Sequence, residues 1–299
     1  MPGKRERYLA QQAELGGNEV VLSTEYWVLS TKEDSESAAA KAADGPDSRV
    51  QETPPASYPT QHSVPSTQRS PPVRTGPRTA AKAKGEGAWK KDAPPIPGPG
   101  LSVISPAPSL IDDVWSGLAS LEAVASTVAA CRKCFLCEGR TNTVPGEGNP
   151  QARLVFVGEG PGATEDETGR PFVGMAGELL DKLLAAIDIA CEDVFIANIV
   201  KCRPPQNRKP LPDEVAACLP YLHRQIALIR PKVIVALGGT AAEALLGVKK
   251  SLGDLRGKVH RFDGLPLIVT YHPAALLRNP NWKKPTWDDI RIARLLLDG

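Results

Sequence analysis

The sequence predicts an α/β fold: a three-layer αβα domain with a central four-stranded parallel sheet, preceded by a disordered N-terminal extension. Three observations predict it. Prolines gather before residue 108, short apolar runs alternate with amphipathic stretches after residue 110, and polar motifs follow those runs. Strands that alternate with helices need right-handed crossovers, which give a parallel sheet covered on both faces.

The expected extension comprises residues 1–108, and the expected folded domain comprises residues 109–299. Fifteen of the 29 prolines lie in the extension, which has no sustained apolar period. Ordering a residue costs about 1–2 kcal/mol of backbone entropy, which so little apolar surface does not offset. Its apolar run at 20–30 is a chance cluster, a short strand or a partner-binding segment. Its basic residues at 74–91 are a solvated linker or a phosphate contact.

Each element of the domain follows from its periodicity and end signals. Leu110–Ala130 has helical spacing. Leu154–Val157 is an apolar run ending at a glycine, typical of a buried strand, and Gly177–Ile187 has the i, i+3, i+4 pattern of an amphipathic helix. Val194–Val200 is a second strand. A helix then begins after Pro212, over residues 213–229, and ends before Pro231.

The last third of the domain repeats this alternation. Val233–Leu237 is a third strand and runs into the helix Ala241–Leu246. Leu267–Thr270 is the fourth strand, and Trp287–Leu297 is the closing helix. Ligands of such sheets bind beyond the carboxyl ends of the strands. The polar residues Glu159, Asn198 and His272 all lie at such ends, so a site is predicted there.

The charge and hydropathy of the chain exclude little. The net charge is +2, so any nucleic-acid contact must come from local patches. The sequence has no run of 18 apolar residues, and its charged start lacks the apolar region of a signal peptide. We therefore expect a cytoplasmic protein without a membrane partner.

All six cysteines lie between residues 131 and 218, which indicates a site instead of a dispersed disulfide framework. Cys131 and Cys134 form C-x2-C, and Cys202 and Cys218 are separated by 15 residues. Four thiolates suit tetrahedral zinc or a [4Fe–4S] cluster, and the spacing does not decide between them. Cys137 extends the first pair to a ferredoxin-like run and is a competing ligand.

Three motifs resemble those of family 4 uracil-DNA glycosylases: GEGPGATEDETGRPFVGMAG at 158–177, NIVKCRPP at 198–205 and YHPAALLR at 271–278. The resemblance extends from about residue 120 to 299. It implies a bacterial or archaeal base-excision-repair enzyme that hydrolyses the N-glycosidic bond of a flipped-out deoxyuridine. It also implies uracil-containing DNA as partner. We expect a monomer, whose extension contacts DNA or another repair or replication protein.

The resemblance assigns roles to the residues of the predicted pocket. Phe172 would stack on the base, with core packing as the alternative, and Asn198 would read the uracil edge with its amide donor and acceptor. His272 would donate to uracil O2, in either protonation state. Glu159 would line the pocket and exclude the 5-methyl group of thymine.

The motifs do not themselves supply a water-activating group at the usual position. The family usually has alanine where this chain has Gly160, which lies in the pocket, and related enzymes place an aspartate there. Neither glycine nor alanine activates water. Glu165 is our candidate for positioning the water or for supporting the cationic sugar, with a solvated loop carboxylate as the alternative.

The remaining assignments concern DNA and the cofactor. The start of a helix at Gly174 and Gly177 offers N–H groups to a DNA phosphate, while Leu276 (or Leu277) with Arg278 would wedge into the space vacated by the base. The resemblance also implies a structural [4Fe–4S] cluster, ligated by Cys131, Cys134, Cys202 and Cys218.

Two other readings compete with the enzyme. An electron-transfer or redox-sensing iron–sulfur protein explains the cysteines but leaves Phe172, Asn198 and His272 without roles. The second alternative is a module that binds uracil in DNA without turnover. One protein of this kind, which resembles the family, carries a nucleophilic histidine in an insert after the second strand. In this chain the corresponding loop, residues 201–210, has no histidine, which argues against covalent trapping of the DNA.

Overall fold

The computed structural model describes residues 20–22, 87–104 and 117–299, and it confirms the α/β class. The described residues form one mostly parallel sheet with strand order β1-β2-β7-β8-β6-β4-β5-β3. The strands are β1 (Val20–Leu22), β2 (Pro99–Ile104), β3 (Glu147–Gly148), β4 (Leu154–Gly158), β5 (Val194–Asn198), β6 (Val233–Leu237), β7 (Val259–Phe262) and β8 (Leu265–Thr270).

The four predicted strands are the contiguous parallel centre of the sheet, β8-β6-β4-β5. The predicted number of four strands was not exact, because edge strands extend the sheet on both sides. β7 pairs antiparallel with β8, and β3 pairs antiparallel with β5. β4, β5 and β6 are buried along their whole length, whereas β7 is buried at alternate residues only. The apolar-run signal therefore found the centre and missed the edges.

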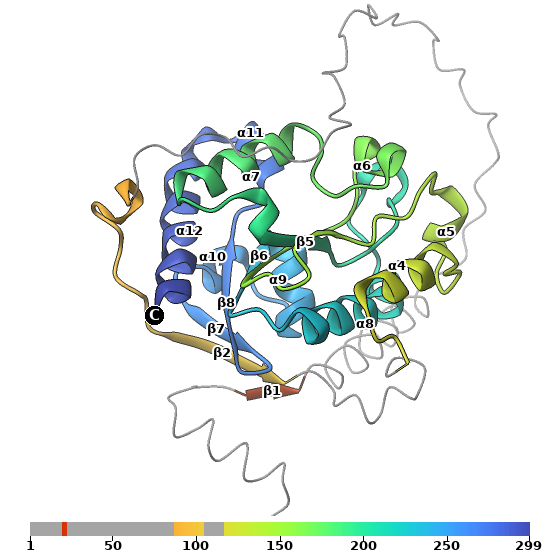
Figure 1. The fold of residues 1–299 in the computed structure, drawn as a ribbon, viewed down its shortest axis with the longest axis horizontal. Helices are drawn as coiled ribbons and strands as arrows, with labels where there is room; N and C mark the ends of the chain where they lie inside the picture. The colour runs from red at the N-terminus through yellow and green to blue at the C-terminus, as the bar shows by residue number, and fades with distance from the viewer. Residues whose placement is uncertain (1–19, 23–86, 105–116) are drawn as a thin grey trace, which may run out of the picture.

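Helices cover both faces of the sheet (Figure 1). On one face α4, α8 and α9 pack against alternate strand residues, Val155 and Val157 among them. On the other face α7 and α12 pack against Leu154 and Phe156. The helices with six or more residues are α4 (Leu121–Ala129), α6 (Ala163–Thr168), α7 (Met175–Ala186), α8 (Pro212–Ile229), α9 (Gly239–Leu246), α11 (Pro273–Arg278) and α12 (Lys283–Asp298).

The helix predicted for residues 110–130 begins later than expected. Residues 110–116 lie outside the described residues, and α4 starts at Leu121. Ser120 has extended backbone and its side chain accepts a hydrogen bond from the Ala123 N–H, which satisfies a free donor of the first turn. This N-cap sets the start of the helix.

Part of the segment assigned to the extension belongs to the sheet. β2 pairs with β7, and the Leu101 N–H donates to His260 Nδ1 at 3.0 Å. Trp89 is buried in the second core cluster. The apolar run at 20–30 contributes β1, parallel to β2. Residues 1–19, 23–86 and 105–116 lie outside the described residues, and so does most of the basic cluster. Within the described ranges, no helix is long and apolar enough to span a membrane.

Candidate active site

A cavity of about 360 Å³ opens at the carboxyl ends of the central strands. The loop after β4, the end of β5 and the loop after β8 all contribute to it, as the fold class predicts. The cavity brings together most of the predicted pocket residues: Glu159, Gly160, Glu165, Phe172, Asn198, His272 and Arg278.

Asn198 lines this cavity and carries an unsatisfied acceptor. It is the last residue of β5 and only 1 % exposed, and its Oδ1 has no hydrogen-bond partner among the described residues. A buried amide oxygen without a partner costs about 1–3 kcal/mol. Gly158, its neighbour on β4, makes room for it, since a Cβ at 158 would lie 2.4 Å from Oδ1. The pairing of β4 with β5 thus leaves room for an amide oxygen that has no donor in the described part of the chain.

Phe172 lies beside this amide in an unusual backbone conformation. Its φ is +52°, in the left-handed region that non-glycine residues rarely adopt, and its side chain is buried at the cavity wall. Gly177 allows the bend, because a Cβ at 177 would lie 1.6 Å from the Phe172 carbonyl oxygen. The Phe172 and His272 rings lie 5.4 Å apart with 30° between their planes. The two rings therefore contact each other in the wall of the same cavity.

His272 is neutral in this environment. Burial lowers the pKa of His272 to about 4, and the positive charge of Arg278 acts in the same direction. Its Nδ1 accepts the Ala274 N–H at 3.2 Å as the N-cap of α11. The proton of the neutral ring is then on Nε2, which is left to donate. The sequence had left the protonation state open, and the structure indicates a neutral donor.

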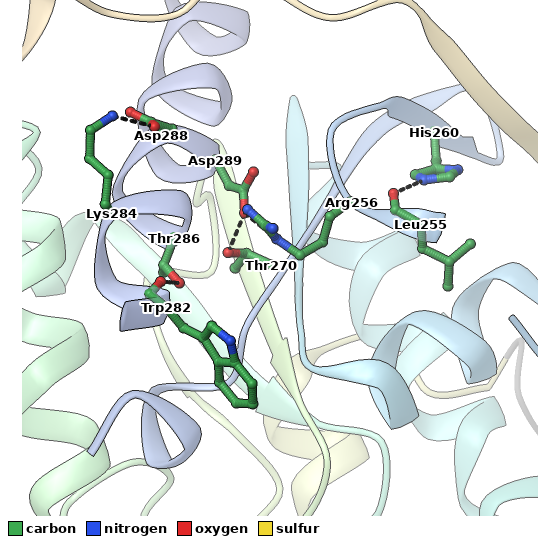
Figure 2. A network of polar contacts seen from close by, with 9 residues as sticks. All are labelled: Leu255, Arg256, His260, Thr270, Trp282, Lys284, Thr286, Asp288 and Asp289. Atoms are coloured by element: carbon green, nitrogen blue, oxygen red, sulfur yellow. Dashed lines mark hydrogen bonds and ion pairs between the residues drawn. The ribbon is translucent and has the colours of Figure 1, made fainter. Parts of the chain in front are cut away.

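A buried polar network supports the β8–α11 loop that carries His272 (Figure 2). Asp289 of α12 accepts hydrogen bonds from Thr270 Oγ1 at 2.6 Å and from Arg256 Nη2 at 2.7 Å. The Arg256 guanidinium also lies 4.4 Å from the centre of the Tyr271 ring, which stacks on Trp282. Both residues that precede His272 are thus fixed from outside the pocket. Sequence reasoning missed this support, since its partners are distant in the chain.

The two pocket glutamates have different surroundings. Glu159 Oε2 accepts a hydrogen bond from Thr240 Oγ1 at 2.6 Å. Glu165 instead accepts three backbone N–H bonds, from Gly162 at 3.2 Å, Val173 at 3.0 Å and Gly174 at 3.1 Å. It therefore braces the start of α6 against the loop that holds Phe172, in addition to lining the cavity.

Gly160 has little room for a side chain. A Cβ there would lie 2.8 Å from Val200 Cγ2 and 3.6 Å from Pro204. Small groups fit only if Val200 moves slightly. The geometry agrees with the absence of a water-activating carboxylate at this position.

Two of the predicted DNA contacts need correction. Leu276 is 0 % exposed, because α11 packs against α7 on that side, so it is not available as a wedge; Leu277 is exposed at 45 %. The Gly177 N–H donates to the Gly174 carbonyl, and the Gly174 N–H donates to Glu165. Neither glycine offers a free N–H to a phosphate. Arg278 does lie at the exposed mouth of the cavity.

The cysteines meet at a second, small site behind β5. Cys131, Cys134, Cys137, Cys202 and Cys218 line one cavity of about 10 Å³. Burial raises the pKa of Cys134 and Cys202, and raises that of Cys218 to about 12. No three His, Cys, Asp or Glu side chains of the described residues converge as a single metal ion requires.

The donor set suits a cluster, since each thiolate of a [4Fe–4S] group binds a different iron and need not converge on one point. Two N–H donors already face the sulfurs. Arg140 Nη1 donates to Cys202 Sγ at 3.2 Å, and the Lys201 backbone N–H donates to Cys218 Sγ at 3.3 Å. Such donors stabilise sulfur that carries negative charge.

Lys201 joins the two sites and was not identified from the sequence. It is fully buried, and its Nζ donates to the Asn198 carbonyl oxygen at 2.9 Å and to Gln225 Oε1 at 2.7 Å. Burial lowers the pKa of Lys201 to about 8. Lysine is rarely buried without partners, but the position of Lys201 in a loop motif did not reveal its partners.

Comparison with known proteins gives a consistent result. The family model for the uracil DNA glycosylase superfamily matches residues 145–295. The type-4 uracil-DNA glycosylase of Thermotoga maritima is 53% identical over 161 residues, covering 53% of this chain and 84% of that protein. That of Saccharolobus solfataricus is 48% identical over 189 residues, 60% of this chain and 88% of the relative. A type-5 uracil-DNA glycosylase of Thermus thermophilus is 34% identical over 188 residues, covering 50% and 85%.

Proposed function

The chain belongs to the uracil-DNA glycosylase superfamily, and to its type-4 family, and from this premise we propose how its pocket releases uracil from DNA. The reaction is hydrolysis of the N-glycosidic bond of a deoxyuridine in DNA repair. The bond between N1 and C1′ breaks with its electron pair on uracil, and a water oxygen then bonds C1′ and loses a proton. The catalytic unit is the domain after residue 109, completed by the edge strand at 99–104.

The unpaired Oδ1 of Asn198 is the observation that carries the proposal. Uracil presents an N3–H donor beside its O4 acceptor, and an asparagine amide matches both. Cytosine presents an acceptor at N3, which would face the Asn198 oxygen without a hydrogen bond. The amide therefore selects uracil, and the cost of its buried, unpaired state is relieved only by the correct base.

Phe172 and His272 complete the binding of the base. The flipped uracil stacks on the Phe172 ring at the cavity wall, which contributes about 1–3 kcal/mol. The Nε2–H of neutral His272 donates to uracil O2, where negative charge gathers as the bond breaks. A donor fixed by an N-cap bond loses no energy to reorientation at that moment.

The glutamates act on the other reactant. Glu159, held by Thr240, lines the base pocket and is the carboxylate with an oxygen left for the attacking water or the cationic sugar. It also takes the space that a 5-methyl group would need. We assign Glu165 to positioning the loop of Phe172, with its negative charge supporting the sugar cation from a distance.

The DNA backbone contacts lie around the mouth of the cavity. Arg278 and Arg208 both line it and would bind flanking phosphates. In the predicted role, we assign the N–H groups of Met175 and Ala176, in the first turn of α7, in place of those of the two glycines. Leu277 replaces Leu276 as the exposed apolar side chain beside the site.

The cysteine site would hold a [4Fe–4S] cluster on Cys131, Cys134, Cys202 and Cys218, with Cys137 beside them. When bound, the cluster crosslinks the 131–140 segment to the loop after β5, and hydrolysis takes no electron from it. Its contribution is thus to the position of that loop. We further propose that the enzyme acts as a monomer and that the extension contacts DNA or another repair protein.

A uracil-containing oligonucleotide tests the function directly. Purified protein should release uracil, and alkali should then cleave the strand at the abasic site. A stable shift in a gel without alkali-sensitive cleavage would instead favour a binding module. If the protein showed neither cleavage nor binding, that result would favour the redox reading.

A further inference from the structure

A third cavity, of about 440 Å³, adjoins the uracil pocket and has no role in the reaction described above. Pro204, in the loop after β5, lines both cavities, so the two adjoin at this residue. The opposite wall belongs to the cysteine segment, at Phe135–Gly139. The groove is lined by Phe135, Leu136, Glu138, Gly139, Arg203, Pro204, Pro205 and Gln206.

Phe135 has a markedly exposed ring in this groove. It is 63 % exposed, although it lies between two cysteines of a segment that packs closely elsewhere. Leu136, the next residue, is buried and holds the short helix α5 (Leu136–Gly139) in place. An aromatic ring presented to solvent from a fixed backbone is a typical platform for an unstacked nucleobase.

The far wall of the groove supplies positive charge in a fixed position. Arg203 Nε donates to Asn207 Oδ1 at 2.8 Å. Gln206 and Asn207 both have φ values near +55°, at 54° and 56°. These conformations turn the loop so that its residues line both cavities, Gln206 the groove and Asn207 the uracil pocket. Glu138 is the acidic group on the rim, so Arg203 must outweigh it for a phosphate to bind.

We propose that this groove binds a nucleotide next to the flipped uracil, with its base on Phe135 and its phosphate on Arg203. The inference rests on the proposed function, because it needs a strand that enters the uracil pocket and continues past Pro204 into the adjoining groove. The occupant is single-stranded DNA, because a base inside a duplex already has both faces covered by its neighbours. The groove therefore favours uracil in unpaired DNA over uracil in a duplex.

Three variants of the full chain test the groove. With a single-stranded uracil oligonucleotide, Phe135→Ala should raise KM about tenfold with kcat unchanged, since one base stack is lost. Phe135→Trp should retain the wild-type KM. Ile96→Ala is the matched control, since Ile96 is 50 % exposed and lines neither cavity. With a duplex substrate, the effect of Phe135→Ala should fall below about threefold.

A fluorescent base gives a readout independent of turnover. 2-Aminopurine placed beside the uracil should be quenched on binding to wild type and to Phe135→Trp, but not to Phe135→Ala. Equal quenching and equal KM for Phe135→Ala and Ile96→Ala would overturn the proposal that the groove binds a nucleotide, provided that wild type releases uracil. Failure of wild type to release uracil from either substrate would instead overturn the proposed function.

Discussion

The uracil pocket and the cysteine site lie at the two ends of one short loop, residues 198–202, yet they are built in opposite ways. The pocket is complete without a bound group: His272 is neutral and oriented, and the Asn198 amide oxygen is buried in the wall of the cavity without a partner in the described ranges. In the cysteine site, burial raises the pKa of the Cys134, Cys202 and Cys218 thiols, that of Cys218 to about 12. Thiolates there need a bound cation.

The difference teaches where each kind of stabilisation comes from. The pocket gains its geometry from the sheet, the glycines and backbone N–H bonds to Glu165. For the cysteine site, our proposal is that a [4Fe–4S] cluster joins its segments. Lys201 links the two sites, since its backbone N–H donates to Cys218 Sγ and its Nζ donates to the Asn198 carbonyl oxygen. The following predictions test this division.

Asn198→Asp should have the largest effect. A carboxylate oxygen at this position would repel the uracil anion as it forms, so release should fall by about 10³-fold or more. The variant should also unfold at a lower temperature than wild type, because a carboxylate buried here without a partner is costly, so activity is compared below the unfolding transition of both proteins. Single-turnover rates with a uracil oligonucleotide measure the first effect, and thermal unfolding the second. A variant with full activity would refute the role of the amide.

Gly177→Ala should come next, although it adds a single methyl group. Its Cβ would lie 1.6 Å from the Phe172 carbonyl oxygen, so the backbone at Phe172 must move. A displacement of this order costs about 10²-fold in rate. Gly160→Ala is the control, because only the Val200 side chain must shift, and we expect less than about threefold. Similar losses in both variants would contradict the geometric account.

Cys202→Ala should act mainly on the cysteine site. We expect loss of the visible iron–sulfur absorbance and a melting temperature lower by about 10 °C, because cofactor binding contributes folding free energy. Uracil release should fall by about tenfold through the displaced loop. Cys137→Ala should keep both the absorbance and the activity. Loss of the cluster in Cys137→Ala with retention in Cys202→Ala would reverse the ligand assignment.

The smallest effect concerns pH. Burial lowers the pKa of His272 and His223 to about 4, below the ordinary value near 6.5. The unfolded chain therefore binds more protons between these limits, and the free energy of unfolding should fall as pH falls, by on the order of 1 kcal/mol per unit for each histidine. His272→Gln and His223→Gln should each reduce this slope in denaturant titrations. Unchanged slopes in both variants would contradict neutral, buried rings.

The centre of the fold could be predicted from the sequence because β4, β5 and β6 are apolar throughout. The edge strands could not: β7 alternates, and β2 lies in a proline-rich segment whose pairing with β7 depends on residues over 150 positions away, such as His260 with Leu101. Periodicity within one segment contains no information about such partners.

The site shows the same limit. Motifs placed Asn198, Phe172 and His272 correctly at one cavity. They did not distinguish buried Leu276 from exposed Leu277, because that depends on which side of α11 packs against α7. Nor did they show that the carboxylate of Glu165 is occupied by the N–H groups of Val173 and Gly174. Those contacts exist only after the loop has folded back.

A crystal of the protein soaked with free uracil tests the central claim most directly. We predict that the base stacks on Phe172, with its N3 within hydrogen-bond distance of Asn198 Oδ1 and its O2 within reach of His272 Nε2. Uracil bound away from these three side chains, or bound with its other edge toward Asn198, would contradict the account.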